Sequence, residues 1–439
     1  MIQPNIPESG LPRVVIVGGG FGGINLAKKL KNAPVQVVML DRNNYHLFQP
    51  LLYQVSTAGL ETDSIAFPLR GIFKHQKNFI FRMAEVTGVR PNENILETGI
   101  GELKYDYLVL ATGSTTNFFG NKVIEEHAIG MKSLIEAVQI RNYVIKQFEE
   151  SLLLNDEEQI RAKLTFIMVG GGPTGVELAG AFAELRKYIM PKDYPELPVD
   201  LMKIYLIEGS PRILNGMSEN SSQRSLESLE KLGVTVLCNT VVKEYDGRTL
   251  LLSNGEKLIS QSLLWAAGVK GVPVTGISSN IVLPNGRIQV NEFNQVQGHN
   301  NIFAIGDIAQ MVNDPKFPKG YPMVAQVAIQ QGANLAGNIL KMRKAASTLN
   351  LKPFKYNDLG SMATIGRNHA VAEFAGMKLS GYFAWMVWMI VHLMSLLGFR
   401  NKLVVFSNWF YRYFTFDRGT RIIIKRGAAN IVKLRQTVQ

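Results

Sequence analysis

Two glycine-rich loops carry the first sign of chemistry in this sequence. A dinucleotide pyrophosphate needs backbone N–H groups at very short range, and side chains would block that approach. A helix that follows such a loop also directs its positive end at the phosphates. Each loop therefore predicts one dinucleotide-binding site. The glycines are Gly18, Gly20 and Gly23 in the first loop and Gly170, Gly172 and Gly175 in the second.

Each loop lies between a predicted strand and a predicted helix, and the next strand ends in an acid. The first unit has strands over 14–17 and 35–40, closed by Asp41. A carboxylate at this position hydrogen-bonds a ribose diol. The second unit repeats the pattern and ends at Glu208. Glu208 would repel a 2′-phosphate and so favours NADH over NADPH, whereas the nearby Arg212 could receive that phosphate.

A third landmark is a short strand over 301–305 that ends in Gly306-Asp307, with a helix beginning near Pro322. Strands that alternate with helices are typical of parallel, doubly wound α/β sheets. The length of 439 residues corresponds to about three domains. We therefore expect an α/β protein with two Rossmann-like domains and a further C-terminal region.

Cysteine and histidine usage excludes several classes of site. Cys238 is the only cysteine, so a disulfide, a CxxC redox pair, a zinc ribbon and an iron–sulfur cluster within one chain are ruled out. We expect Cys238 to be a buried small hydrophobe. The six histidines show no metal-ligand spacing, so we expect no metal site. Residues 1–11 carry neither an apolar core nor a basic cluster, which predicts a cytoplasmic location for the nucleotide-binding part.

The order of the motifs resembles the flavin disulfide reductase-like superfamily. Between and after the two loops stand Ala111-Thr112-Gly113, the segment 265–268 and Ile305-Gly306-Asp307. Within that superfamily the chain resembles the type II NADH:quinone oxidoreductases nearly end to end. This narrower resemblance rests on segments 45–54, 173–179, 325–330, 398–401 and 415–419. The missing redox cysteines count against the disulfide reductases and the sulfide:quinone oxidoreductases.

The resemblance implies tightly but non-covalently bound FAD, with NADH as substrate. It implies a discontinuous FAD-binding domain over 1–118 and 267–345, with an NADH-binding domain over 119–266 inserted into it. Residues 346–439 would then form a C-terminal membrane-anchoring region with amphipathic helices. The FAD residues implied are Gly18, Gly20, Phe21, Gly22, Gly23, Asp41, Arg42, Thr112, Gly113, Asp307, Ala325, Gln326 and Lys378. The NAD residues implied are Gly170, Gly172, Pro173, Thr174, Gly175, Glu177, Glu208, Ala267 and Gly268.

Glu177 is the candidate catalytic residue. On sequence alone, it could simply be a carboxylate favoured by the field of a helix N-terminus. The resemblance instead places it at the nicotinamide–flavin junction, where it would orient NADH or couple proton movement. Gln326 and Gln330 share a helix face through their i, i+4 spacing, and they are either solvent-facing amides or donors to quinone carbonyls. The resemblance favours quinone for both, and places Lys378 near the quinone as well.

The C-terminal part combines an uncharged run with a basic tail. Residues 379–399 hold no charged side chain, and residues 400–439 hold nine Lys or Arg and one Asp. A run of 21 residues could span a bilayer. Its scattered aromatic groups and the basic tail instead suit a helix lying on an anionic membrane surface. A dimer interface would use the same apolar face.

We therefore predict a membrane-associated enzyme on the cytoplasmic face, peripheral or monotopic, that oxidises NADH and reduces menaquinone or ubiquinone without pumping protons. A homodimer is the expected assembly. Two thirds of the net charge of +12 lies in residues 400–439, beside the apolar run, so nucleic acid is not an expected partner. Two alternatives stay open. One is a soluble FAD-dependent reductase of a ferredoxin-like partner, and the other is an FAD- and NAD-binding redox sensor.

Overall fold

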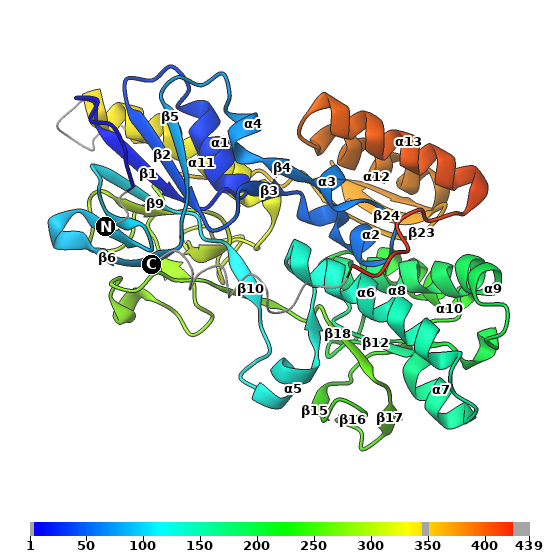
Figure 1. Cartoon of the computed structure of the whole chain (residues 1–439). Coiled ribbons are helices and arrows are strands. Elements are labelled where there is room, and N and C mark those ends of the chain that lie inside the picture. The colour runs from blue at the N-terminus through cyan, green and yellow to red at the C-terminus, as the bar shows by residue number, and fades with distance from the viewer. Residues whose placement is uncertain (1–3, 345–350, 425–439) are drawn as a thin grey trace, which may run out of the picture.

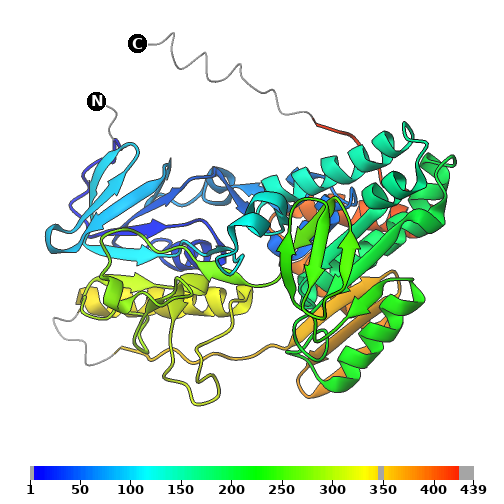
Figure 2. The ribbon, with the colours of Figure 1, turned by 90° about the horizontal axis from the view of Figure 1, so that it is seen from below.

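The computed structural model describes residues 4–344 and 351–424, and the chain forms two α/β units side by side (Figures 1 and 2). Each unit is built on a five-stranded parallel sheet. The first sheet has the order β21-β9-β1-β2-β5 and the second has the order β11-β18-β12-β13-β14. The central strands of each sheet have mainly apolar residues, as expected for strands that are covered on both faces. Val14, Val15 and Ile16 of β1, for example, have no exposed surface.

The first sheet is completed only after the chain has built the second. Strands β1 (Arg13–Val17), β2 (Gln36–Asp41), β5 (Phe79–Met83) and β9 (Tyr107–Leu110) come early, whereas β21 (Ile302–Ala304) follows the whole second unit. β21 pairs with β9 in parallel register. Helix α1 (Phe21–Lys29) packs against α11 (Ala325–Lys344), which also arrives late in the chain. The first fold is therefore discontinuous, with the second inserted into it.

The second sheet contains β11 (Ile129–Gly130), β12 (Thr165–Val169), β13 (Lys203–Ile207), β14 (Thr235–Leu237) and β18 (Ser262–Trp265). Helices α6 (Leu134–Ser151), α7 (Glu157–Leu164), α8 (Pro173–Glu184), α9 (Met190–Asp193) and α10 (Glu219–Lys231) accompany it. A two-stranded antiparallel ribbon, β10 (Ser114–Thr116) with β19 (Val269–Gly271), lies where the chain passes between the units.

Smaller elements complete the two units. They are β3 (Tyr45–Leu47), β4 (Ala66–Pro68), α4 (Leu69–Ile72), α5 (Lys122–His127), β20 (Ile288–Gln289), β22 (Ala309–Gln310), and the antiparallel sheets β6–β8 (Val86–Arg90, Ile95–Thr98, Gly101–Lys104) and β15–β17 (Val242–Tyr245, Thr249–Leu252, Lys257–Ile259).

One early segment packs away from its own sheet. α2 (Leu52–Ser56) and α3 (Thr62–Ile65) belong to the 1–118 part of the chain. Their buried side chains nevertheless join the same apolar cluster as β12 and α8 of the second unit. The boundary expected from sequence at residue 118 therefore does not separate the cores, because the first unit sends this segment across the junction.

The C-terminal region is part of that shared core. Strands β23 (Ser361–Gly366), β24 (His369–Phe374) and β25 (Met377–Ser380) form an antiparallel sheet, and β23 lies directly on α8. A Cβ at Gly180 of α8 would lie 1.8 Å from the carbonyl oxygen of Ile365, so only glycine permits this approach. The region expected to be an appended anchor is thus packed on the second unit.

The uncharged run does not form one long helix. It contributes the end of β25, helix α12 (Gly381–Ser395), and a turn through Gly398, whose φ is +77°, before α13 (Phe399–Thr415) begins. In residues 4–344 and 351–424, no helix combines the length and apolarity needed to cross a membrane. The last part of the predicted basic tail, residues 425–439, lies outside the described residues.

Candidate active site

The first glycine loop joins β1 to α1, and its three glycines serve two purposes. A Cβ at Gly18 would lie 2.2 Å from the carbonyl oxygen of Ala111, and one at Gly23 would lie 2.0 Å from that of Gly18. These two glycines let backbones pack together. At Gly20, by contrast, a Cβ would meet no described atom within 4 Å. The loop therefore keeps an open space in front of the N-terminus of α1, which is the position a pyrophosphate requires.

The second loop, between β12 and α8, repeats this division. A Cβ at Gly175 would lie 1.8 Å from the carbonyl oxygen of Gly170, whereas one at Gly172 would again meet none of the described atoms within 4 Å. Gly170, with φ +109°, backs onto Ala266 and Ala267. Pro173 and Thr174 are exposed at the start of α8, beside the open space.

In each unit, the acid at the strand end accepts a hydrogen bond from the middle of that unit's glycine loop. The N–H of Gly19 donates to Asp41 Oδ2 at 2.7 Å, and the N–H of Gly171 donates to Glu208 Oε2. Burial raises the pKa of Asp41, although two backbone N–H groups oppose that shift. Arg212 donates to the carbonyl oxygens of Met217 and Asn215. Two of its nitrogens are thereby bound to backbone oxygens, although the guanidinium keeps its positive charge.

The other residues predicted to bind FAD lie along the same edge of the first sheet. Asp307 follows β21 and accepts hydrogen bonds from Ser114 Oγ and from Lys132 Nζ at 3.3 Å. Thr112 donates through Oγ1 to the carbonyl oxygen of Val272 at 2.6 Å. Gly113 has φ +71° and open space around it among the described atoms. Gly22 packs against Ile305 and Ala328.

Three further predicted FAD residues are placed less centrally. Phe21 opens α1 and meets the ring of His46 edge-on at a centroid distance of 4.9 Å. Arg42 is exposed just beyond β2, and Ala325 begins α11.

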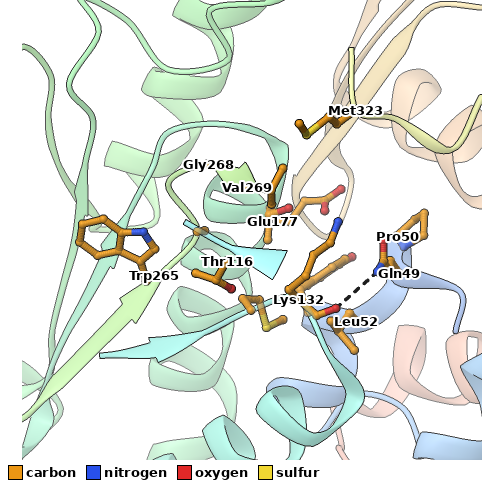
Figure 3. Close-up of a pocket in the computed structure, with 14 residues that line it drawn as sticks. Gln49, Pro50, Leu52, Thr116, Lys132, Glu177, Trp265, Gly268, Val269 and Met323 are labelled. Atoms are coloured by element: carbon orange, nitrogen blue, oxygen red, sulfur yellow. Dashed lines mark hydrogen bonds between the residues drawn. The ribbon is translucent and has the colours of Figure 1, made fainter. Parts of the chain in front are cut away.

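A cavity of about 200 Å³ lies at the junction of the two units (Figure 3). In the close-up, Lys132 and Glu177 stand between Gln49–Leu52 of the first unit and Gly268–Val269, which follow the second sheet. The cavity therefore takes walls from both nucleotide-binding folds. Its lining comprises Gln49, Pro50, Leu52, Tyr53, Thr116, Met131, Lys132, Thr174, Glu177, Trp265, Ala266, Gly268, Val269 and Met323.

Glu177 is the buried acid of this cavity. It lies on the second turn of α8 with 8% of its surface exposed, and burial raises its pKa to about 8. The backbone N–H of Thr364, 3.5 Å away, and the Trp388 side chain oppose that shift only in part. At neutral pH the side chain is therefore mostly protonated, and it can give up a proton near pH 7.

A second, smaller cavity continues from the other side of Glu177. Glu177 and Tyr53 line both cavities, and the second is closed by Trp385, Trp388 and Trp409 from α12 and α13. Arg418 is buried beside it and pairs with Glu184 at 3.0 Å. From the sequence, we assigned no role in the site to Tyr53, Trp388 or Arg418. Tyr53 and Arg418 do lie within segments 45–54 and 415–419, whereas nothing in the sequence singles out Trp388.

The two glutamines predicted to bind quinone share one face of α11, and the amides bind a neighbouring segment. Gln326 donates to the carbonyl oxygen of Gly360 at 3.0 Å and accepts from the N–H of Leu359. Gln330 donates to the carbonyl oxygen of Asn357 at 2.8 Å and accepts from the N–H of that residue. Neither residue is simply solvent-facing, because both hold the segment that leads into β23.

Lys378 and Cys238 lie outside the two cavities. Lys378 is exposed on β25, opposite Glu373 of β24. Cys238 is half-buried after β14, and burial raises the pKa of its thiol. The expectation of a fully buried cysteine is thus met only in part. Within the described residues, no cluster of His, Cys, Asp and Glu could hold a metal ion.

Two α/β units, each with a glycine-rich loop, share one cavity, and comparison with known proteins identifies the class as the pyridine-nucleotide oxidoreductases. Residues 12–332 match the family model for pyridine nucleotide-disulphide oxidoreductases, and residues 359–418 match the NDH2 C-terminal domain. The chain is 34% identical to a type II NADH:quinone oxidoreductase of Mycobacterium tuberculosis, over 97% of this chain and 93% of that protein. It is 30% identical to that of Haemophilus influenzae, over 83% and 87% of the two chains.

The fold also has close counterparts among solved structures. NDH2 from Plasmodium falciparum, solved in complex with NADH, superposes with a TM-score of 0.86 at 23% identity and covers 94% of this chain and 100% of that one. A sulfide:quinone oxidoreductase from Aquifex aeolicus gives a TM-score of 0.71 at 19% identity, over 92% and 95% of the chains. The chain belongs to the type II NADH:quinone oxidoreductases, and it is an enzyme that reduces quinone with NADH.

Proposed function

We propose that the first fold binds FAD non-covalently and that the second binds NADH, so that the cavity between them holds the nicotinamide beside the flavin. The observation that carries this proposal is the cavity lined by both units, together with one open glycine position in the glycine loop of each unit, Gly20 in the first and Gly172 in the second. FAD supplies the two-electron carrier between NADH and quinone when it is bound.

The residues of the first unit fit an FAD dinucleotide. Gly20 leaves room for the pyrophosphate, Asp41 closes β2 where a ribose diol would lie, and Asp307 stands beside Thr112 and Gly113 at the same sheet edge. In the second unit, Gly172, Pro173 and Thr174 surround the space for the NADH pyrophosphate. Glu208 faces the adenosine ribose and favours NADH over NADPH by repelling a 2′-phosphate.

The chemistry asked of the protein is mainly positioning. Holding a hydride donor and acceptor at roughly 3–3.5 Å replaces a bimolecular encounter with a local step. The walls from Gln49–Tyr53 and from Gly268–Val269 exclude water from that contact. Glu177 holds a proton where both cavities meet, so it can deliver that proton to an oxygen of the quinone as the latter is reduced.

We propose that quinone is drawn from a membrane surface on the side of α12 and α13. These helices expose large apolar side chains, including Phe383 (74% exposed), Phe399 (76%) and Phe414 (65%). An exposed apolar face of this kind fits lipid, and the exposed Arg400 at the start of α13 would face anionic headgroups. Attachment is then monotopic, on the cytoplasmic face, as a homodimer, and electron transfer proceeds without proton pumping.

The test separates the two half-reactions. Purified enzyme should show flavin absorbance, release FAD on denaturation, lose colour on anaerobic addition of NADH, and regain it on addition of a short-chain quinone. A colourless, active preparation would contradict the FAD assignment. Reconstituted vesicles should show NADH:quinone turnover without acidification of the lumen, and acidification would contradict the absence of pumping.

The quinone assignment of Gln326, Gln330 and Lys378 stays a prediction, and α11 offers a matched control for it. Gln330→Ala should slow reoxidation by quinone while leaving reduction by NADH within about twofold. Asn334 lies one turn further along the helix and holds the carbonyl oxygen of Lys352 at 3.1 Å, so Asn334→Ala removes a similar tether elsewhere. Equal effects of the two changes on quinone reoxidation would refute a specific role for Gln330.

A further inference from the structure

Trp388 is the most deeply buried aromatic side chain between α12 and the active-site cavity. Only 2% of its surface is exposed. Its ring stacks on His392 at a centroid distance of 4.1 Å and meets Tyr53 edge-on at 6.4 Å. Trp409 lies against it at 5.7 Å. Three aromatic neighbours therefore fix the orientation of the indole.

The indole N–H of Trp388 is an orphan donor. Within residues 4–344 and 351–424, no acceptor is hydrogen-bonded to Nε1, although the atom is buried. Buried donors of this kind are uncommon and call for a partner in some state of the protein. Trp409, in the same cavity, does have one, because its Nε1 donates to Gln54 Oε1 at 2.8 Å. In this cavity the indole N–H of Trp409 therefore has an acceptor, whereas that of Trp388 has none among the described residues and can donate to one.

The carboxyl group to which Trp388 can donate a hydrogen bond is that of Glu177. Both line the second cavity, and the Trp388 side chain favours the charged form of the Glu177 carboxyl. The other carboxylate there, Glu184, is already paired with Arg418 at 3.0 Å and accepts from the N–H of Arg367 at 2.7 Å. The remaining titratable and charged groups around the two cavities are Tyr53, Lys132, Arg367, His392, Arg412, Tyr413 and Arg418.

The cationic groups of that set have other partners. Arg367 donates to the carbonyl oxygens of Tyr413 and Arg412, and Arg412 donates to that of Gly59 at 2.8 Å. Lys132 pairs with Asp307 at 3.3 Å. His392 stays neutral near pH 7, since burial lowers its pKa to about 4. No cation in this set is paired with Glu177 in the described structure, so a carboxylate there depends on neutral donors.

We infer that Trp388 is the positioning residue for Glu177, and that its indole N–H donates to the carboxylate once Glu177 has released its proton to a quinone oxygen. The inference rests on the proposed role of Glu177. The O–H bond of Glu177 breaks as one O–H bond of the quinol forms. The two electrons and the other proton of the quinol come from the hydride of NADH through the bound cofactor, and a proton from solvent restores Glu177. Helix α12 therefore supplies a residue to the chemistry as well as a face to the membrane.

The experiment follows the pH dependence of reoxidation by a short-chain soluble quinone, in the pre-reduced holoenzyme. The wild-type rate should fall above an apparent pKa set by Glu177, because the protonated acid is the active form. We call this fall in rate the alkaline limb. Trp388→Phe removes the donor that stabilises the carboxylate, so the apparent pKa and with it the limb should move up by about one pH unit. The constant rate at acidic pH should drop about threefold to tenfold. Reduction by NADH should change less than twofold. An unmoved limb overturns the inference.

Two comparisons separate the hydrogen bond from packing. Trp388→Gln keeps an N–H donor, whereas Trp388→Met has a side chain of similar length without one. Because a donor lowers the pKa of Glu177, the limb should lie at lower pH in Trp388→Gln than in Trp388→Met. Trp385→Phe makes the same ring change one turn earlier in α12 and should leave the position of the limb in place. Equal positions for Gln and Met, or a shift caused equally by Trp385→Phe, would refute a specific hydrogen bond.

A Glu177→Gln background distinguishes this inference from the proposed function. If Glu177 is the proton donor, Glu177→Gln abolishes the limb, and adding Trp388→Phe then changes the rate by less than twofold. A limb that survives Glu177→Gln refutes the role proposed for Glu177. If the limb disappears in Glu177→Gln but Trp388→Phe still has its full effect on the rate in the double variant, Glu177 remains the proton donor. The coupling of Glu177 to Trp388 is then refuted.

Discussion

Gly172→Ala should weaken NADH binding while leaving the fold intact. Gly172 precedes α8 with φ −71° and ψ 179°, a conformation open to alanine, and its Cβ would meet no described atom within 4 Å. The cost to the free energy of unfolding is therefore about 1 kcal/mol or less. The added methyl would instead occupy the space expected for the pyrophosphate. Loss of one or two charge-assisted hydrogen bonds, about 3 kcal/mol, corresponds to roughly a hundredfold weaker binding.

Isothermal titration of the oxidised holoenzyme with NAD⁺ and the KM for NADH measure this effect, with urea unfolding and flavin content as readouts of the fold. Gly175→Ala is the contrasting variant, because its Cβ would lie 1.8 Å from the carbonyl oxygen of Gly170. It should lose several kcal/mol of stability. An unchanged KM in a stable Gly172→Ala enzyme would refute the assignment of this loop to NADH. A Gly175→Ala enzyme as stable as wild type would refute the packing argument.

Three further outcomes are expected. Gly20→Ala should purify folded with much less flavin, measured by the ratio of flavin to protein absorbance. Gly23→Ala should be destabilised in urea, because its Cβ would lie 2.0 Å from the carbonyl oxygen of Gly18. Burial holds the pKa of Glu177 in the folded protein near 8, above its ordinary value of 4.5, so the stability of the wild type falls as pH rises from 4.5 to 8. Glu177→Gln removes this loss, so its free energy of unfolding should exceed that of the wild type increasingly over the interval, by roughly 2–5 kcal/mol at the upper end. A constant difference in urea midpoint between pH 5 and pH 8 would contradict this. Glu208→Gln should narrow the kcat/KM preference for NADH over NADPH at least tenfold, with an unchanged ratio as the contrary result.

Local spacing was enough to predict the nucleotide-binding folds. The order of strand, glycine loop, helix and acid can be read directly, because each feature depends on neighbours within one βαβ unit. The packing roles of Gly18 and Gly170 cannot, because these glycines lie against Ala111 and against Ala266 and Ala267, which are far away in the sequence. Asp41 and Glu208 end their strands as expected, and each reaches its own loop. The resemblance to a family added the expectation of a discontinuous first domain, and in the structure the late strand β21 pairs with β9.

Only the tertiary structure decided how these parts meet. The amides of Gln326 and Gln330 are satisfied by residues 356–360, which their i, i+4 spacing does not reveal. The uncharged run breaks at Gly398 into two helices, and Trp388 turns inward to the cavity of Glu177. These outcomes depend on contacts between residues far apart in the chain, made when α8, β23 and α12 pack together. A sequence pattern reports which side of a helix is apolar, but which buried polar group faces which acid is set by packing across the whole molecule.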